Sequence, residues 1–167
     1  MDINIALKKL ENSQHFKQWK QKNKATYLSY IFKIPQEMQK DDCQMGFYDH
    51  KKDKITTFVL SDGAVNMREE EDVFKHDEMD VKEIELGKIK LDFDSIIFRA
   101  NEFQQRNFPK DRSIKTIAIL QNLPSLGNIW NITYVTETFN TLNMKIDASN
   151  GKILEHNLTS VFEFRAK

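Results

Sequence analysis

Apolar and polar residues alternate in four runs that fill much of the second half of the chain. Alternation with a period of two is typical of strands that bury one face and expose the other. The runs are IKTIAIL, NIWNITYVT, TLNMKIDA and KILEHNL, and SVFEF is a further candidate. Because strands joined by short turns usually pair with their sequence neighbours, these runs predict an antiparallel meander.

A helix is predicted immediately before this meander. Apolar residues recur at helical spacing between Phe93 and Phe103, and Asp92 or Asp94 is placed to cap the N-terminus of the helix. Pro109, which has no backbone N–H to donate, closes it. The second half of the chain is therefore predicted as one helix followed by strands.

The first half shows the same order of elements. An amphipathic helix is predicted from Ile3 to Lys22, with a bend near Asn12 and Ser13, whose side chains compete for backbone hydrogen bonds. Strands are predicted at residues 28–34, 44–48 and 54–60. The residues expected on one side of the first strand are Leu28, Tyr30, Phe32 and Ile34.

These patterns predict an α+β fold in which two helices pack on antiparallel sheet. We divide the chain into a helix-plus-strands half at residues 1–62, an acidic connector at residues 63–90 and a helix-plus-meander half at residues 91–167. The connector has a weak pattern and contains the carboxylate-rich run EEEDVFKHDEMD. The two halves are expected to be tandem units that share one continuous sheet.

The predicted turns give a second indication of internal repetition. DHKKDKI begins at Asp49 and DASNGKI begins at Asp147, and the two runs share their spacing. A match this short also arises by chance, because turns favour Asp, Asn, Gly and Lys. If the halves are repeats, the two hairpins should superpose, each lying across its own helix.

The second turn and the strand before it resemble a known family. Asn150 and Gly151 tolerate the positive φ of a tight hairpin, and Asp147 can accept hydrogen bonds from amides of the loop. Together with the aromatic-led strand NIWNITYV, this run resembles the PepSY family between Leu91 and Leu158. The residues that carry the resemblance are Trp130, Ile132, Tyr134, Ile146, Asp147, Gly151, Lys152 and Ile153.

The resemblance implies a cystatin-like layout, with a helix packed on an antiparallel sheet, and a non-catalytic role. Some PepSY members are inhibitory parts of peptidase precursors, and many are secreted or membrane-attached. This chain departs from that pattern in three respects: it shows no signal sequence, no attached peptidase and no Gly in the first hairpin.

The overall charge argues against general binding to nucleic acid or to anionic membranes. Lys plus Arg number 25 and Asp plus Glu number 25, so no net positive field attracts a polyanion. The single cysteine, Cys43, allows no internal disulfide. The N-terminal sequence lacks the pattern of a signal peptide, and no apolar run reaches membrane-spanning length. We therefore expect a cytoplasmic protein that binds neither nucleic acid nor membranes.

No motif predicts catalysis, a metal site or a cofactor. The densest group of potential metal ligands is His76, Asp77, Glu78 and Asp80. This group lacks the spacing of an EF-hand loop and is interpreted as a solvated acidic segment. Cys43 lies beside Asp41 and Asp42, whose charges disfavour its thiolate. The chain is therefore predicted not to be an enzyme and to bind no cofactor.

Most of the aromatic residues are interpreted as core, because helix-on-sheet packing buries aromatic rings readily. They are Phe16, Trp19, Tyr27, Tyr30, Phe32, Phe47, Tyr48, Phe58, Trp130 and Tyr134. Phe16 and Trp19 lie in the run KKLENSQHFKQWKQKNK, where lysines and aromatics mix as in a base-stacking or interfacial helix. We interpret this run as a solvated helix face with two buried aromatics. The alternative is contact with nucleic acid or a membrane through Lys17, Lys20 and Lys22.

The leading hypothesis is a non-catalytic protein-interaction or regulatory module of PepSY-like type, whose partner is another protein. Recognition is expected through the exposed sheet face or an edge strand. The candidate binding residues are Trp130, Ile132, Tyr134, Asp147, Gly151 and Lys152. The alternative is a small-ligand-binding cystatin-like domain, or an enzyme, with a pocket between helix and sheet. The identity of the partner and the oligomeric state do not follow from the sequence.

Overall fold

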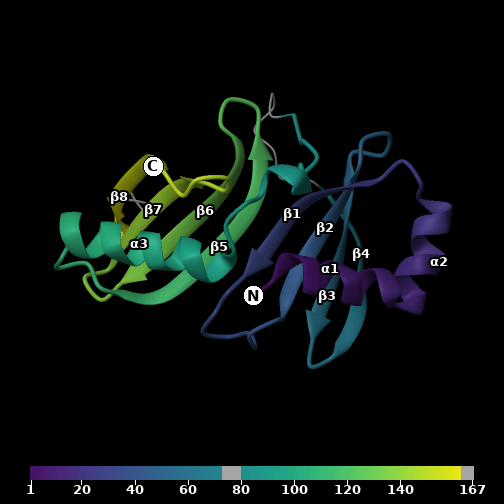
Figure 1. The fold of residues 1–167 in the computed structure, drawn as a ribbon, viewed down its shortest axis with the longest axis horizontal. Helices are drawn as coiled ribbons and strands as arrows, with labels where there is room; N and C mark the ends of the chain where they lie inside the picture. The colour runs from purple at the N-terminus through teal and green to yellow at the C-terminus, as the bar shows by residue number, and fades with distance from the viewer. Residues whose placement is uncertain (73–79, 163–167) are drawn as a thin grey trace.

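One antiparallel sheet runs through the whole structure. The computed structural model describes residues 1–72 and 80–162, and describes residues 69–72 by their backbone. Eight strands in this described part form the sheet in the order β4-β3-β2-β1-β5-β6-β7-β8 (Figure 1). Their bounds are β1 Tyr27–Lys33, β2 Cys43–Asp49, β3 Lys54–Ser61, β4 Ala64–Asp72, β5 Ser113–Leu123, β6 Gly127–Thr136, β7 Asn140–Asp147 and β8 Ile153–Ser160.

The strand order places the first strand of each half at the centre of the sheet. β1 pairs with β5 through four antiparallel residue pairs, from Tyr30↔Gln121 to Lys33↔Ala118. We call this pairing the seam. Outward from the seam, β2, β3 and β4 continue the sheet on one side, and β6, β7 and β8 continue it on the other. The two halves thus share one continuous sheet, as expected from the sequence.

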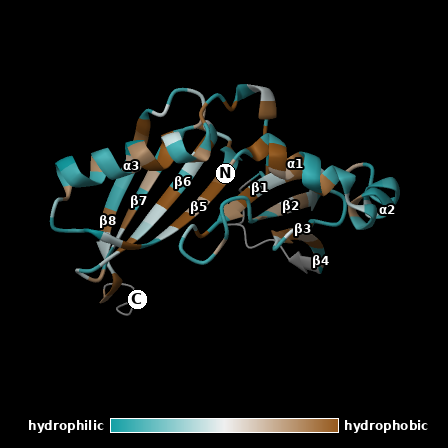
Figure 2. Ribbon diagram, turned by 60° about the horizontal axis from the view of Figure 1, so that its bottom comes forward, coloured by the Kyte–Doolittle hydropathy of each residue, from teal (hydrophilic) through white to brown (hydrophobic). Residues whose placement is uncertain are grey.

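Three α-helices in the described part of the chain cover one face of the sheet (Figure 1, Figure 2). α1 (Ile3–Asn12) and α2 (Gln14–Lys22) lie over the first half, and α3 (Phe93–Asn107) lies over the second. We call this side the helix face and the other side the open face. The α+β class is confirmed, but the prediction of two helices is wrong. Ser13 has extended backbone, with ψ 131°, and divides the first predicted helix.

Apolar residues between the helices and the sheet form the core. α1 buries Ala6 and Leu10, α2 buries Phe16, and α3 buries Phe93 and Ile96. The strand residues of this core include Ile31, Met45, Phe58, Leu120, Trp130, Ile132, Leu142 and Met144. Figure 2 shows hydrophobic residues along the strands beneath the helices. Burial of one large apolar side chain contributes about 1.5–3 kcal/mol, so this layer supplies the main stabilisation of the fold.

β1 departs from the alternation of side chains that its sequence predicts. An irregularity in its pairing with β2 lies between Leu28 and Tyr30. Leu28 and Ile31 both belong to the core on the helix face, whereas Tyr30 and Phe32 alternate with Ile31 and face the open side. The expectation that Leu28, Tyr30 and Phe32 share one side is wrong, because a β-bulge shifts the alternation by one residue.

The sequence pattern does not predict β4, which occupies residues 64–72 of the expected connector. β4 is an edge strand with few apolar residues: Val65 packs against the core, but Met67 is exposed. Edge strands carry a weak period-two signal because only part of one face is buried. Residues 73–79, which include His76, Asp77 and Glu78, lie outside the described residues. The division of the chain into two halves and a connector stays a prediction.

The elements predicted for the second half are confirmed. α3 begins after Asp92, whose carboxylate accepts a hydrogen bond from the Ser95 N–H at 2.8 Å. Hydrogen bonding to Ser95 lowers the pKa of Asp92. All four predicted strands form, as β5 to β8. The further candidate strand SVFEF does not form: Ser160 ends β8, Val161 and Phe162 are not in a strand, and Glu163 and Phe164 lie outside the described residues.

The two similar turns occupy different places in the sheet. Asp49 precedes the turn between β2 and β3, whereas Asp147 precedes the turn between β7 and β8. Counted outward from the seam, the first turn joins the second and third strands of its half, and the second turn joins the third and fourth. The two hairpins therefore do not occupy equivalent places in the two halves, which is not what true repeats would give. Their likeness is local, because each Asp carboxylate accepts a hydrogen bond from the amide two residues later, Lys51 at 3.0 Å and Ser149 at 2.7 Å.

A glycine shapes the open face next to the seam. Tyr30 pairs with Gly46 of β2, and the Tyr30 hydroxyl is hydrogen-bonded to Thr57 Oγ1 of β3 at 2.8 Å. The ring of Tyr30 therefore crosses β2 above Gly46. A Cβ atom at position 46 would lie 2.0 Å from Tyr30 Cε1, so glycine is required for the ring to lie there.

Gly46→Ala is expected to destabilise the protein by about 1–3 kcal/mol, because the ring of Tyr30 must move and its hydrogen bond to Thr57 is lost. Gly87→Ala is the matched control, since no atom lies within 4 Å of the added Cβ. The control should change the free energy of unfolding by less than about 0.5 kcal/mol. Urea unfolding followed by circular dichroism measures both. Equal effects of the two substitutions would contradict the packing of Tyr30 on Gly46.

Candidate binding face

The three strand residues predicted for binding lie in the core. Trp130, Ile132 and Tyr134 alternate along β6 on the helix face, and at most 1% of each is exposed. The rings of Trp130 and Phe93 of α3 have centroids 5.3 Å apart, and the Tyr134 hydroxyl donates to Asn101 Oδ1 at 2.6 Å. Burial raises the pKa of Tyr134. These side chains hold α3 on the sheet, and a partner could reach them only if α3 moved.

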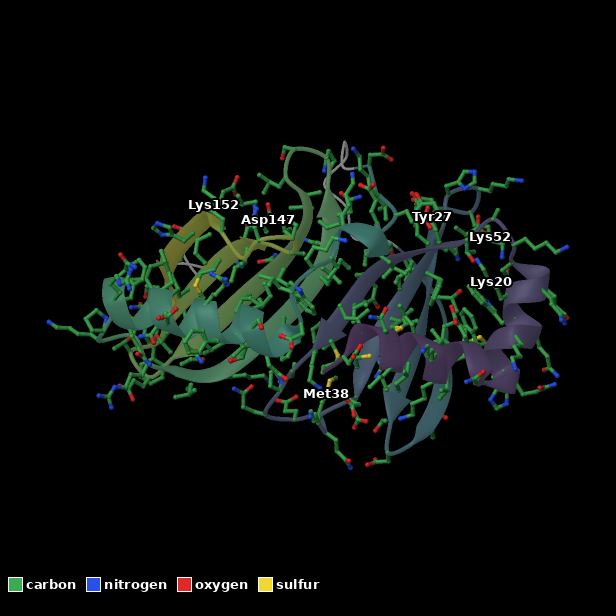
Figure 3. The ribbon with its side chains drawn as sticks, in the orientation of Figure 1. Lys20, Tyr27, Met38, Lys52, Asp147 and Lys152 are labelled. Atoms are coloured by element: carbon green, nitrogen blue, oxygen red, sulfur yellow. The ribbon has the colours of Figure 1, made fainter. Side chains whose placement is uncertain are left out.

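Asp147 ends β7, and Gly151 and Lys152 lie in the turn between β7 and β8. Figure 3 shows Asp147 and Lys152. Asp147 Oδ1 accepts hydrogen bonds from the Ser149 N–H at 2.7 Å and from its hydroxyl at 2.6 Å, and Oδ2 accepts from Asn150 Nδ2 at 3.0 Å. Burial raises the pKa of Asp147, but these hydrogen bonds outweigh burial and leave the pKa below its ordinary value. The expected role of Asp147 as acceptor in the turn is confirmed. Lys152 is exposed.

The same turn supports the segment that leads into α3. Ala148 O accepts hydrogen bonds from the amides of Lys90 and Leu91 at 3.1 and 3.2 Å. Gly151 has φ +75°, and an added Cβ would lie 2.3 Å from Arg99 Cδ of α3. Both its backbone conformation and its surroundings therefore require glycine. The turn has a structural role that accounts for its residues.

The open face presents the other set of alternate side chains. Two rows of residues cross it in the registers of neighbouring strands, and no helix of the described residues lies on this side (Figure 2). One row is Arg68, Thr57, Gly46, Tyr30, Gln121, Ile129 and Asp147, of which Thr57 and Ile129 are buried. The other row is Asn66, Val59, Gln44, Phe32, Ile119, Asn131, Lys145 and Glu155.

A shallow groove of about 470 Å³ lies on the open face at the seam. Phe32 and Ile119 are directly paired across the seam, and both are half-buried. The complete lining is Tyr30, Phe32, Gln44, Arg68, Ile119 and Gln121. The groove thus combines an apolar floor, at the place where the two halves meet, with amide and guanidinium groups around it.

Apolar surface continues along the open face beside this groove and ends at a polar border. The neighbouring half-buried apolar residues are Ile55, Val59, Ile117 and Val135. On β6 and β7, Asn143 Nδ2 donates to Asn131 Oδ1 at 2.6 Å and to Thr133 Oγ1 at 2.8 Å. Lys145 pairs with Glu155 of β8 at 2.6 Å. An apolar centre with a polar border is the usual composition of a protein-binding surface.

The aromatic residues of α2 pack on the sheet. Phe16 is buried, and the ring of the half-buried Trp19 lies 5.0 Å from that of Phe58 and 5.7 Å from that of Phe47. Lys20, at the last turn of α2, is partly buried, and this burial lowers its pKa (Figure 3). The interpretation of the two aromatics as core residues is confirmed fully for Phe16 and partly for Trp19.

Cys43 is buried at the start of β2. Burial raises the pKa of its thiol to about 11, with Asp42 adding to the increase and Lys33 opposing it. The expected direction is confirmed, but burial rather than the neighbouring carboxylates is the main cause. The thiol is therefore protonated and unreactive at neutral pH.

The described part of the chain contains neither a cluster of metal ligands nor a membrane-spanning helix. No group of three or more His, Cys, Asp and Glu side chains there is arranged to hold a metal ion. No helix among these residues is long and apolar enough to span a membrane. The cytoplasmic location stays a prediction.

Sequence reasoning placed Tyr30 and Phe32 in the core and did not single out the other residues of the groove. One signal was present, because IKTIAIL is apolar at adjacent as well as alternate positions. Such a run is typical of a central strand with two apolar faces. The sequence does not show that β5 lies beside β1, and this pairing is what brings Ile119 next to Phe32.

The structure defines an α+β protein whose helices cover one face of an antiparallel sheet. No protein-family model matches the sequence, and no curated protein matches it. Among solved structures, the chain is similar to a candidate lipoprotein from Clostridium difficile 630, with a TM-score of 0.57 and 14% sequence identity. The similarity covers 86% of this chain and 90% of that chain, so it extends over both halves. At this identity the likeness shows the fold alone.

Asp147 makes the stability of the protein depend on pH. Because its folded pKa lies below the unfolded value of about 3.9, its contribution is present above that pH and is lost as pH falls through the folded pKa. Asp147→Asn is expected to cost about 1 kcal/mol at pH 7, and progressively less as pH falls below about 3.9 and through the folded pKa, measured by urea unfolding. Ser149→Ala should raise the pKa of Asp147 in an NMR titration. A cost of Asp147→Asn that does not change with pH would contradict this account.

Proposed function

We propose that this chain is a non-catalytic protein-interaction or regulatory module of PepSY-like type, built from two tandem units, that binds a partner protein across its open face. The observation that supports the proposal is the apolar surface centred on Phe32 and Ile119, on the side that no described helix covers. Contiguous apolar surface of this kind marks interaction sites in folded proteins.

The sheet is a suitable platform for such an interaction. Residues on a hydrogen-bonded sheet are already ordered, so little conformational entropy is lost when a partner binds. Phe32 and Ile119 supply the central apolar contact, and the Asn131, Asn143 and Thr133 network supplies a polar border. The mechanism is recognition by shape and apolar burial, without a chemical step.

The alternative, a ligand pocket or active site between helix and sheet, has less support. Phe93, Ile96 and Ala100 of α3 are at most 3% exposed, and they fill the space above the buried residues of β6 and β7. The groove at the seam lies on the opposite side of the sheet. This alternative stays a prediction.

Affinity capture from an extract of the native host tests the proposal. Phe32→Glu places a charge in the centre of the open face, and Phe98→Glu is the matched control because Phe98 is 64% exposed on α3. We expect the wild type and Phe98→Glu to retain the same protein, and Phe32→Glu to retain roughly tenfold less of it or none.

Both variants should keep the circular dichroism spectrum of the wild type, and Phe32→Ser replaces Phe32→Glu if the charge prevents folding. Capture that is lost with Phe98→Glu and kept with Phe32→Glu would move the binding surface to the helix face. No retained protein with any variant would count against an interaction module.

A further inference from the structure

The groove at the seam has a chemical character more specific than an apolar patch. This inference rests on the proposed function, because it concerns the part of a partner that would occupy the groove. Three features of the groove indicate which kind of segment would fit it. They are one cation without a partner among the described residues, two side-chain amides without such partners, and an apolar floor. Each is a property of described residues.

Arg68 is the cation of the groove. Its row on the open face continues through Thr57 and Gly46 to Tyr30. Arg68 starts on edge strand β4, yet it lines the same groove as Ile119 of β5. Its side chain therefore reaches inward over the sheet and brings a positive charge towards the apolar floor.

Two described lysines of the open face are already paired with carboxylates. Lys115 pairs with Glu37 at 2.5 Å, and Lys145 pairs with Glu155 at 2.6 Å. Within the described residues, by contrast, no carboxylate or carbonyl oxygen is hydrogen-bonded to Arg68. Among the described side chains of the open face, Arg68 is therefore a cation beside the apolar centre without a carboxylate partner, which favours a partner group of negative charge.

The amides of Gln44 and Gln121 flank the floor on either side of β1. Neither side chain has a hydrogen-bond partner among the described residues, and both line the groove. A side-chain amide offers both donors and an acceptor, which suits the N–H and C=O groups of a peptide backbone. The backbone of the floor itself is engaged in the pairing of β1 with β5, so backbone contacts to an occupant must come from these side chains.

We propose that the groove binds an internal segment of the partner protein that carries an Asp or Glu beside an aliphatic or aromatic residue. The apolar residue contacts Phe32 and Ile119, the carboxylate pairs with Arg68, and the two glutamine amides bond the segment's backbone. A free C-terminal carboxylate is a poorer fit, because terminal carboxylates are captured by clusters of backbone N–H groups and the floor of this groove has none to spare.

Selection from a display library of random dodecapeptides, flanked by fixed linkers at both ends, tests the proposal on the full-length protein. We expect enriched peptides to carry Asp or Glu next to a large apolar residue. A selected peptide, synthesised with an acetylated N-terminus and an amidated C-terminus, should bind about two- to fivefold more weakly to Arg68→Gln and roughly tenfold more weakly to Phe32→Ala.

Arg106→Gln is the matched control for charge, because Arg106 is exposed on α3 away from the open face, and it should leave peptide binding unchanged. Arg68→Glu should redirect the selection to peptides with Lys or Arg. High salt should weaken the binding of the selected peptide to the wild type. It should weaken the binding to Arg68→Gln by a smaller factor.

Enrichment of basic or uncharged peptides, or no enrichment, would overturn the proposed segment. Equal binding to wild type, Phe32→Ala and Arg68→Gln would also overturn it, because the peptide would then bind elsewhere. Neither result changes what the capture experiment measures. A partner that binds the open face through a flat folded surface would still be captured there, which distinguishes it from the absence of any partner.

Discussion

Four residue pairs between β1 and β5 join two four-stranded units into one sheet, and the rest of the molecule is arranged around that junction. Contacts at both ends of the seam reinforce it. At one end, Gln36 exchanges two hydrogen bonds with Thr116, at 3.1 and 3.2 Å. At the other end, the Ile84 amide donates to Leu28 O at 2.9 Å. The loop after β1 and the segment before α3 thus add contacts at the two ends of this short pairing.

The junction explains why the two faces of the sheet differ. On the helix face, α1 with α2 and α3 each cover their own half, and alternate strand residues form the core beneath them. On the open face the apolar residues gather where β1 meets β5, and polar side chains occupy β7 and β8. The bulge in β1 and the glycine at position 46 act together here. The bulge turns Tyr30 and Phe32 to the open side, and Gly46 lets the ring of Tyr30 lie across β2.

Much of the fold could be predicted from local pattern, because helices and interior strands bury one regular set of positions. The helical spacing of apolar residues from Phe93 to Phe103, with Asp92 as the cap, predicted α3 with nearly its observed bounds. The alternation of apolar and polar residues did the same for β5 to β8. β4 was not predicted, because its apolar residues do not alternate regularly with polar ones: it is an edge strand, and its Met67 is exposed. The bulge in β1 was also missed, since an inserted residue leaves no fixed mark in sequence.

The candidate site was harder to predict than the fold. Trp130, Ile132 and Tyr134 have the composition of a recognition strand, but whether such a strand faces a helix or the outside depends on tertiary packing, and here α3 covers them. The groove is assembled from residues of four strands, including Arg68 of β4 and Ile119 of β5. No local pattern brings these residues together; the strand order does.

Native-state hydrogen exchange with increasing urea tests most directly whether the seam unites the two halves. The backbone amides of residues 30–33 and 118–121 should exchange only through the global unfolding that exposes the slowest amides of both halves, with the same dependence on urea. Exchange of the seam amides through a smaller opening, with either half remaining protected, would show two independent units and would contradict a single binding face built across them.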